Sequence, residues 1–412
     1  MGLSSGGIHA PDGPQDPFRR RPMRRRMNDR QGLTLDRPLV IATLVVIHVA
    51  VAVVLVARAG TLFGADGVER YSEIAGEGGM PYRDFDVEYP IADLPLIELM
   101  AESDVEGTYR HVVITALIGD LLCALAVAYG WGYATAGRYL LAMLPVLFLI
   151  FLGDDVIWLG LTVFSLALMR RGRQGLGGAA LGLAALGRVW PLILVPTVVV
   201  PTTRRAILPL AVVTSVGLAS WLVLAGFRGP EEVFGFRGAH GWEIESLVGA
   251  TIWVVSGRST VLESGAPRLG HLEIWHRFVL GVTLIIGLIA IGRRTKAWIG
   301  DVAGVPAIVA VAFLLAVSPI FGLGYAAWLV PWIAIAFPEG SARPFVVAAA
   351  AVVVLTGVLS VLYVTTSTVW LVKMLVLARG APCLAIVAGW FWATRRDATS
   401  GTITEPSSLP TV

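Results

Sequence analysis

Residues 66–90 of this 412-residue chain read DGVERYSEIAGEGGMPYRDFDVEYP, a polar and acidic run that is rich in turn-forming residues. The run follows closely on the first long apolar segment, Leu39 to Ala57, which is long enough to cross a bilayer as a helix. Seven carboxylates therefore gather at the edge of a membrane. The dielectric there is intermediate, so the pKa of a carboxyl group can be tuned for chemistry.

The composition is that of a membrane protein. Hydrophobic residues make up 56% of the chain and charged residues only 15%, and the mean hydropathy is +0.75. Apolar windows of roughly 15–20 residues recur along the sequence. Because backbone groups in lipid must hydrogen-bond within the chain, we expect an all-α fold, a polytopic bundle of about twelve transmembrane helices.

Hydropathy and charge together predict the membrane spans. The expected spans are 39–57, 112–130, 139–152, 156–169, 207–226, 278–291, 303–319, 326–337, 344–363 and 381–392. Residues 175–201 have basic groups at both ends, which favours two short helices that meet at an outward-facing Arg188. A charge at that depth costs a few kcal/mol unless it is paired, so Arg188 is expected to face protein or an anionic ligand.

The chain is expected to have three regions. Residues 1–38 form a basic, disordered cytoplasmic tail, 39–394 the transmembrane domain, and 395–412 a second disordered cytoplasmic tail. The large outer loops are about 59–110 and 227–275, and the first holds twelve acidic residues against three arginines. This pattern predicts a multi-pass protein of the cell membrane with both termini in the cytoplasm, with membrane lipids as partners and without a nucleic-acid partner.

Two apolar pieces in the outer loops are too short to span a bilayer. Leu94 to Met100 is expected to pack as a short interfacial helix, and Leu247 to Val255 to lie in the interface or re-enter. Cys123 and Cys383 lie in apolar runs, which favours buried thiols over a disulfide.

Sequence motifs for soluble-nucleotide chemistry are absent. There is no P-loop, dinucleotide glycine fingerprint, nucleophile elbow or zinc motif. The outer histidines have no metal-ligand spacing; they are His240, His271 and His276. We therefore expect no cofactor and no metal site, while the use of a divalent cation stays open.

Three groups of residues suggest chemistry at the outer surface. Asp66 is suited to act as a general base for a sugar hydroxyl, with helix capping or loop solvation as the alternative. The aromatic and acidic segment 80–90 can stack on a sugar and accept from its hydroxyls, or it can be an ordered interfacial loop. Asp154 and Asp155 can cap the following helix, or they can bind a cation or a polar acceptor.

Several segments, taken in order from about residue 40 to about residue 340, resemble glycosyltransferase family 87 of the GT-C superfamily. Besides Asp66 through Tyr71, they are GGMPYRDFDVEYP (78–90), GDDVIWLGLTVFSLAL (153–168), GLAALGRVWPLILVP (182–196), RGAHGWEIES (237–246) and SPIFGLGYAAWLVP (318–331). The resemblance implies a GT-C-like membrane enzyme. Such an enzyme moves a sugar, expected to be mannose, from a polyprenyl phosphate to a glycolipid or polysaccharide acceptor outside the membrane, with inversion.

The resemblance also implies roles for particular residues. Asp66 matches the catalytic base, and Arg188, where the family commonly has lysine, would meet the lipid phosphate with Arg237 or His240. The further residues expected to bind donor or acceptor are Tyr71, Tyr82, Arg83, Asp84, Asp86, Glu88, Tyr89, Asp154, Glu245 and Ser246. The rival interpretation is a transporter or flippase of a lipid-linked envelope precursor, which predicts inverted repeats and charge at the membrane midplane. A non-catalytic scaffold for envelope assembly is a third.

Overall fold

The fold is that of a computed structural model, which describes residues 35, 37–59, 66–234, 241–263, 266–298, 300–365 and 369–399. All of these residues belong to one compact unit, Thr34–Val412. The two tails expected at 1–38 and 395–412 lie largely outside the described residues, so their disorder stays a prediction.

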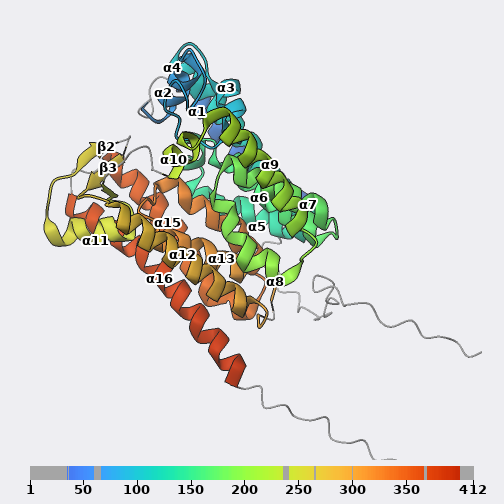
Figure 1. The fold of residues 1–412 in the computed structure, drawn as a ribbon. Coiled ribbons are helices and arrows are strands. Elements are labelled where there is room, and N and C mark those ends of the chain that lie inside the picture. The colour runs from blue at the N-terminus through green and yellow to red at the C-terminus, as the bar shows by residue number, and fades with distance from the viewer. Residues whose placement is uncertain are drawn as a thin grey trace, which may run out of the picture. The chain divides into compact units, whose positions relative to one another are not determined.

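Helices make up nearly all of the described chain (Figure 1), as predicted. The α-helices are α1 (Pro38–Ala57), α2 (Asp66–Gly76), α3 (Leu94–Met100), α4 (Val105–Trp131), α5 (Tyr133–Met143), α6 (Asp155–Arg170), α7 (Gln174–Gly187), α8 (Val200–Thr202), α9 (Ile207–Ala225), α10 (Arg228–Phe234), α11 (Leu247–Ser256), α12 (Ile274–Thr295), α13 (Val305–Val317), α14 (Val330–Ala336), α15 (Arg343–Thr365) and α16 (Val369–Thr399). The 3₁₀ helices are η1 (Ile91–Asp93), η2 (Leu144–Val146), η3 (Leu149–Leu152), η4 (Trp190–Ile193), η6 (Leu323–Leu329) and η7 (Gly340–Ala342), and η5 (Val195–Val199) is a π-helix.

Six of the described helices are long and apolar enough to cross a membrane, namely α1, α4, α9, α12, α15 and α16. Five shorter apolar helical segments accompany them within the described residues. Apolar side chains stand exposed on the outer faces, such as Val216 on α9 and Phe278 on α12, which is how a lipid-facing surface looks. The chain is therefore a helical membrane protein.

Several predicted elements are confirmed, and one is replaced. The short helices at 94–100 and 247–255 are α3 and α11, and the pair that was expected to meet at Arg188 is α7 and η4. The expected span 139–152 is instead the end of α5 followed by 3₁₀ turns. Pro145 falls in this stretch and has no N–H to continue an α-helix.

Small residues allow the central helices to pack closely. A Cβ atom on Gly119 of α4 would lie 2.6 Å from the backbone nitrogen of Ile157, and one on Gly160 of α6 would lie 2.8 Å from the carbonyl oxygen of Gly119. The two backbones can approach this closely because neither glycine has a side chain. This contact sets the position of the N-terminus of α6, where two acidic residues stand.

A fully buried polar group joins α1 to its neighbours. Nδ1 of His48 lies 2.5 Å from Oδ2 of Asp120 on α4, and the Tyr139 hydroxyl donates to the other Asp120 oxygen at 2.6 Å. Nε2 of His48 is 3.1 Å from the Leu140 carbonyl oxygen. Because each of the three side chains is satisfied, this group explains how polar residues are tolerated between membrane helices.

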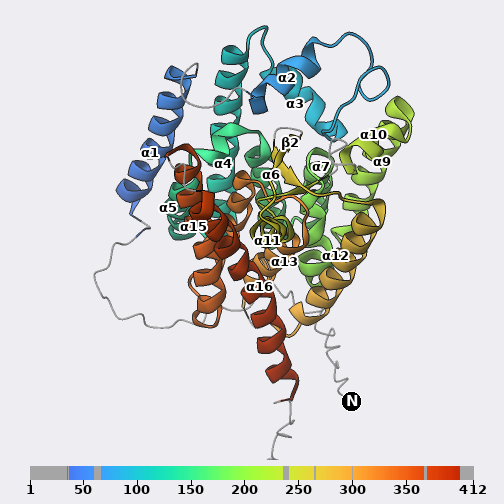
Figure 2. The same cartoon turned by 90° about the vertical axis from the view of Figure 1, so that its left-hand side faces the viewer.

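The two ends of the bundle differ in charge. Basic residues follow α6, precede α9 and end α12. The opposite end carries α2 and α3, which Figures 1 and 2 place away from the C-terminal end of α16. By the positive-inside rule we expect the basic end to be cytoplasmic, and we call the opposite end the outer end.

The second outer loop contains a small antiparallel sheet that we did not predict from the sequence. Its order is β1 (Trp242–Glu243), β3 (Ala266–Leu269) and β2 (Val261–Glu263), with Glu243 opposite Arg268. Strands of two to four residues are too short to show an alternating pattern. The sheet adds a small β element to a fold that is otherwise helical, and it places Glu243 at the outer end.

The last helix begins earlier than expected. We placed the final span at 381–392, but α16 starts at Val369 and continues through Pro382. Arg379 lies within this helix and is fully buried. Its guanidinium donates to the carbonyl oxygens of Glu245 and Phe321 at 2.6 and 2.9 Å. An arginine is rare inside a membrane helix, and these hydrogen bonds satisfy part of its charged group.

Candidate active site

Arg188 lies at the centre of an acidic cluster at the outer end. Its Nε donates to Oδ1 of Asp155 at 2.6 Å, and its two terminal nitrogens pair with Asp93 and Asp154. We call these four residues the Arg188 cluster. Asp93 and Asp154 are almost completely buried, whereas Asp155 is one-third exposed. The cluster joins η1, the N-terminus of α6 and the end of α7.

Local packing explains why Arg188 reaches these carboxylates. Helix α7 ends at Gly187, and the backbone of Arg188 is extended. A Cβ atom on Gly187 would lie 2.3 Å from the ring of Trp158, so only glycine allows this approach. Trp158 in turn donates its indole N–H to Oδ1 of Asp93 at 2.6 Å. Helices α6 and α7 therefore hold the cluster from two sides.

Two tyrosines connect the first outer loop to the cluster. The Tyr71 hydroxyl on α2 donates to Oδ1 of Asp154 at 3.0 Å. The rings of Tyr71 and Tyr89 have centroids 5.4 Å apart, and the Arg188 guanidinium lies 5.3 Å from the Tyr89 ring centroid. Both tyrosines, predicted as binding residues, thus lie next to the cluster, where the Tyr89 ring packs against the guanidinium.

The cluster holds three carboxyl groups and one cation, so its charges do not balance if all three carboxyls ionise. Burial raises the pKa of Asp154 to about 6, although the Tyr71 hydrogen bond opposes this shift. Its Oδ2 atom has no hydrogen-bond partner in the described chain. The Asp154 carboxyl therefore takes up a proton at a higher pH than an exposed aspartate does.

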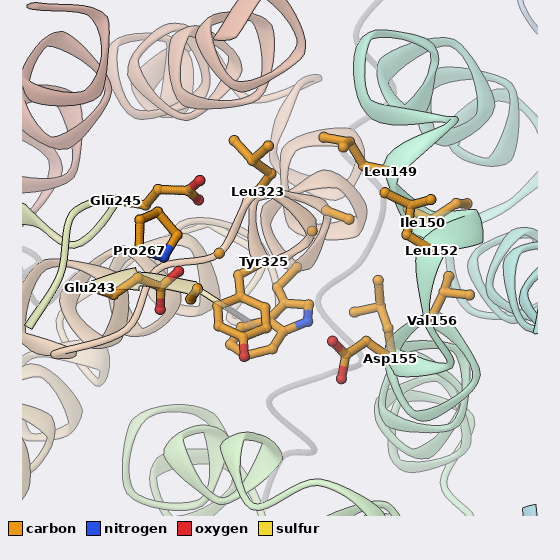
Figure 3. Close-up of a pocket in the computed structure, with 17 residues that line it drawn as sticks. Leu149, Ile150, Leu152, Asp155, Val156, Glu243, Glu245, Pro267, Leu323 and Tyr325 are labelled. Carbon is orange, nitrogen blue, oxygen red and sulfur yellow. The ribbon is translucent and has the colours of Figure 1, made fainter. Parts of the chain in front are cut away.

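A cavity of about 340 Å³ opens beside the cluster, and we call it the acidic cavity. Figure 3 shows Asp155 on one side and Glu243 and Glu245 on the other, with Tyr325 between them. Its lining residues are Leu149, Ile150, Leu152, Gly153, Asp155, Val156, Leu159, Glu243, Glu245, Ala266, Pro267, Gly322, Leu323, Gly324, Tyr325, Ala327 and Trp328. The charged side chains among them are all carboxylates.

Arginines lie near the two glutamates of the cavity. Nη2 of Arg379 lies 4.0 Å from Oε2 of Glu245, and Arg268 stands opposite Glu243 in the sheet. Burial and the charge of Glu245 together raise the pKa of Glu243 to about 7, against the charges of Arg268 and Arg379, which lower it. Burial also raises the pKa of Glu245. Both carboxyls therefore titrate closer to neutrality than an exposed glutamate does.

A second and larger cavity of about 810 Å³ lies against the first, and we call it the apolar groove. It runs between α12, α13 and the η4–η5 segment, and most of its lining is aliphatic. Arg277 and Ser318 line it where α12 begins and α13 ends, at the outer end of the bundle. Tyr325 and Trp328 line both the groove and the acidic cavity.

These shared aromatic residues form a continuous stack. The ring centroids of Tyr325 and Trp328 are 4.4 Å apart, and those of Trp328 and Trp190 are 4.7 Å apart, with nearly parallel planes. The stack separates the cavity that contains the carboxylates from the apolar groove. A molecule with one polar end and one long apolar part would match this arrangement.

The predicted sugar-binding segment 80–90 is a tightly held loop. Tyr82 is buried with a φ of 66°, an uncommon backbone conformation for a tyrosine. Its hydroxyl donates to the Tyr89 carbonyl oxygen at 2.6 Å, and its ring packs against Trp221. Asp84 accepts from the Met80 backbone N–H at 2.7 Å. These contacts explain the odd backbone, and they leave Tyr82 and Asp84 facing the loop itself.

The remaining charged residues of this loop are bound to arginines or exposed. Arg70 on α2 pairs with Glu88, and Arg228 pairs with Asp86 at 2.5 Å. Arg83 is exposed. None of these residues lines the acidic cavity or the apolar groove in the described chain. The ion pairs of Glu88 and Asp86 hold the loop in place. A role of these residues in substrate binding stays a prediction.

The other predicted site residues have mixed positions. Asp66 is the first residue of α2, the helix that brings Tyr71 to the cluster, but the structure does not describe its side chain. Arg237 and His240 lie outside the described residues. Ser246 is buried and caps α11 by accepting from the Gly249 backbone N–H at 3.0 Å, so it stands apart from the cavity lining.

Sequence reasoning missed several residues of the site. Asp93 was counted among the loop acids without a role, and Glu243 was left out although its neighbour Glu245 was named. Arg379 had a usable signal, because an arginine within an apolar stretch needs a partner. No signal in the sequence points to Tyr325 and Trp328 as a shared wall, since that depends on the packing of η6. No group of three or more metal-ligating side chains occurs among the described residues.

Comparisons with known proteins give a distant likeness. No family model and no curated protein matches the chain. Among solved structures, ArnT from Cupriavidus metallidurans in the apo state shares 18% identity and a TM-score of 0.42, over 86% of this chain and 76% of that one. ArnT bound to undecaprenyl phosphate shares 15% identity and a TM-score of 0.40, over 87% and 78%. Likeness at this level transfers no function, so we infer function from this chain's own residues.

Proposed function

We propose that this membrane protein is a glycosyltransferase that takes a sugar from a polyprenyl phosphate and passes it to an acceptor on the outer face of the membrane. The observation that carries the proposal is the wall of Tyr325 and Trp328 shared by the acidic cavity and the apolar groove. A lipid-linked sugar has a long apolar chain and a polar head, and the two spaces fit these parts in turn. The family 87 resemblance supports the same class of donor.

The groove suits the lipid chain. Its walls are mostly leucine, isoleucine, valine and proline side chains from α12, α13 and the η4–η5 segment. Burial of apolar surface there favours binding by roughly 25 cal/mol per Å² before the costs of ordering the chain. Ile285 and Ile289 of α12 line the groove and are also exposed, so the groove can be reached from the apolar outer face of this helix.

The phosphate requires a cation at the outer end of the groove. Arg277 is the charged residue among the described residues that line the groove, and it stands in the first turn of α12. Ser318 lines the groove as well. The resemblance had assigned this role to Arg188, but Arg188 already contacts three carboxylates. We therefore propose Arg277 for the phosphate, and for Arg188 the role of holding Asp155 at the cavity.

The reaction can be written as an in-line displacement. The acceptor hydroxyl gives its proton to the Asp66 carboxylate, and its oxygen forms a bond to the anomeric carbon of the donor. The bond from that carbon to the phosphate oxygen breaks, and the lipid phosphate leaves with the electron pair, stabilised by Arg277. One displacement inverts the configuration at that carbon. Mannose remains the proposed sugar and a glycolipid or polysaccharide the proposed acceptor.

A flippase for a lipid-linked precursor would also use an apolar groove beside a polar cavity. The distribution of charge favours the transferase, because the described carboxylates of both loops gather at the outer end instead of at the midplane. The two classes make different predictions for the bond between sugar and phosphate. A transferase breaks this bond, and a flippase leaves it intact.

The experiment is a transfer assay in membranes with radiolabelled polyprenyl-phosphate mannose, in which the parent is compared with Asp66→Asn. Asparagine keeps the shape of the side chain and removes the base, so transfer should fall by about 100-fold or more. Glu69→Gln, an exposed carboxylate on the same helix, is the matched control and should transfer like the parent. Equal transfer by Asp66→Asn and the parent would show that another group is the base.

A further inference from the structure

The acidic cavity presents hydrogen-bond acceptors to whatever fills it. The charged residues that line it are Asp155 on α6 and Glu243 and Glu245 of the second outer loop, and they stand on facing walls (Figure 3). No arginine, lysine or histidine occurs among the described lining residues. An ionised carboxylate is acceptor-only, with about four lone-pair positions on its two oxygens.

Cations stand behind these carboxylates. Arg188 donates to Asp155 at 2.6 Å, and Nη2 of Arg379 is 4.0 Å from Oε2 of Glu245. Arg268 faces Glu243 across the sheet. Arg188 holds Asp155 by a hydrogen bond, and the charges of Arg268 and Arg379 favour the ionised forms of the two glutamates. None of the three arginines lines the cavity. The charged side chains that a ligand meets are therefore all acidic, although three arginines lie near them.

A buried donor without an acceptor lies at the same cavity. The ring of Trp328 lines the cavity and is 7% exposed, and its indole N–H has no hydrogen-bond partner in the described chain. A buried N–H group without a partner is costly, so it points to a ligand oxygen at this wall. The lining of the cavity is thus complementary to a ligand with several hydroxyl donors and at least one oxygen acceptor.

The size of the cavity and its aromatic wall narrow the class of ligand. Its volume of about 340 Å³ lies at the lower end of the range for small-molecule sites, so it has room for a sugar ring. Tyr325 provides an apolar ring face beside the carboxylates, on which the C–H groups of a sugar can pack. Hydroxyl donors and an apolar ring face occur together in neutral sugars.

We infer that the cavity selects an electrically neutral, polyhydroxylated sugar and excludes sugars that carry a carboxylate, with Glu243, Glu245 and Asp155 as the residues that set this specificity. The inference rests on the proposed function, since it concerns the sugar of the lipid-linked donor. A sugar carboxylate would bring a negative charge into a cavity whose charged side chains are all carboxylates. Repulsion between like charges would oppose its binding.

The test compares two donors that bind the purified full-length protein in detergent. Both carry the same short polyprenyl phosphate and the same hexose ring, and they differ only at C6, which is a hydroxymethyl group in one and a carboxylate in the other. Titration calorimetry at pH 8 gives the two dissociation constants without any transfer step. We expect the neutral donor to bind at least about tenfold more tightly.

Variants connect this preference to the cavity. Glu243→Gln and Glu245→Gln each supply an amide N–H donor in place of a carboxylate of similar shape, so the preference should fall to about threefold or less. Glu98→Gln, an exposed position on α3 away from the cavity, is the matched control and should keep the full preference. Since glutamine preserves volume, both variants should fold, and thermal unfolding of each checks this.

The outcomes separate the two proposals. A neutral-donor preference that the Gln variants reduce supports the selection. Equal binding of the two donors by the parent, or tighter binding of the carboxylate donor, overturns the proposed selection. Either result is still consistent with the proposed function, because a lipid-linked donor binds. A preference that survives in both Gln variants also overturns the assignment to these residues. Absence of binding by either donor contradicts the proposed function itself, and the inference falls with it.

Discussion

Tyr325 and Trp328 stack with their ring centroids 4.4 Å apart, and the pair forms the boundary between the acidic cavity and the apolar groove. This contact places a space for a polar head directly beside a space for a lipid chain. The proposed function depends on this juxtaposition more than on any one charged residue, and the predictions below test its parts separately.

The first prediction concerns the aromatic wall. Tyr325→Ala removes the ring face on which the sugar would pack, and we expect the KM for the lipid-linked donor to rise about tenfold. Tyr325→Phe keeps the ring and should raise the KM by less than about threefold. Tyr133→Ala, at an exposed position on α5, is the control. Equal KM values for Tyr325→Ala and the control would remove Tyr325 from the binding site.

The second prediction concerns the lipid chain. Leu284 lines the apolar groove, so Leu284→Trp should fill part of it and weaken donor binding by about tenfold or more. The loss should be smaller for a donor with a shortened polyprenyl chain, because less of that chain reaches the filled part. Ile286→Trp lies on the exposed face of the same helix and should have little effect. A loss that is independent of chain length would contradict the lipid assignment.

The third prediction separates two arginines. If Arg277 meets the lipid phosphate, Arg277→Gln should raise the dissociation constant for polyprenyl phosphate by about tenfold or more, since a hydrogen bond to a charged group contributes about 1.5–3 kcal/mol. Binding measurements with the lipid phosphate alone, without a sugar, isolate this contact. If Arg277→Gln bound polyprenyl phosphate with unchanged affinity, the phosphate would have to bind to a cation other than Arg277.

Arg188 should instead matter for stability. Arg188→Gln leaves Asp93, Asp154 and Asp155 without their cation, and we expect a loss of about 3–5 kcal/mol in the free energy of unfolding, seen as a lower Tm in detergent. Adding Asp93→Asn to Arg188→Gln removes one uncompensated charge and should restore part of the Tm.

The matched control for this prediction is Arg228→Gln, which breaks a largely exposed pair with Asp86. Such pairs contribute about 0–1 kcal/mol, so its Tm should stay close to that of the parent. Equal changes in Tm for Arg188→Gln and Arg228→Gln would contradict the buried cluster.

The fourth property to measure is the pH dependence of stability. Burial and the charge of Glu245 raise the pKa of Glu243 to about 7 in the folded chain, with Arg268 and Arg379 opposing the shift. Between about pH 5 and 7 the folded state keeps a proton that the unfolded chain has lost, so Glu243 lowers stability as pH rises through this window. Glu243→Gln removes the titration, and its Tm relative to the parent should be a few degrees higher at pH 8 than at pH 5. The same Tm difference at both pH values would contradict the raised pKa.

Much of the fold follows from hydropathy, and the exceptions have physical reasons. The turn at Arg188 was predictable because basic groups at both ends of 175–201 do not suit a single span. The start of α16 was not predictable, because Arg379 and Pro382 indicate the end of a membrane span in the sequence. In the structure the helix continues through both residues, and loop carbonyl oxygens accept hydrogen bonds from the Arg379 guanidinium. The small sheet escaped notice because its strands are too short for a periodic signal.

The candidate site was predictable in its region more than in its contacts. An excess of carboxylates at the outer end, and Asp154 and Arg188 as members of a site, could be expected from residue type and position alone. Which carboxylates meet Arg188, and which line a cavity, depends on the close approach of α4, α6 and α7 at Gly119, Gly160 and Gly187. No pattern along one chain encodes that three-dimensional approach.

The most direct test follows the bond between sugar and phosphate in proteoliposomes that contain the purified parent, an acceptor extract and a panel of radiolabelled polyprenyl-phosphate sugars that includes mannose. The same vesicles report whether the labelled lipid crosses the bilayer. We predict that label leaves the lipid and appears in the acceptor as free polyprenyl phosphate accumulates. Label that stays on the lipid for every donor, while the lipid crosses the bilayer faster than in empty vesicles, would contradict the transferase and identify a flippase.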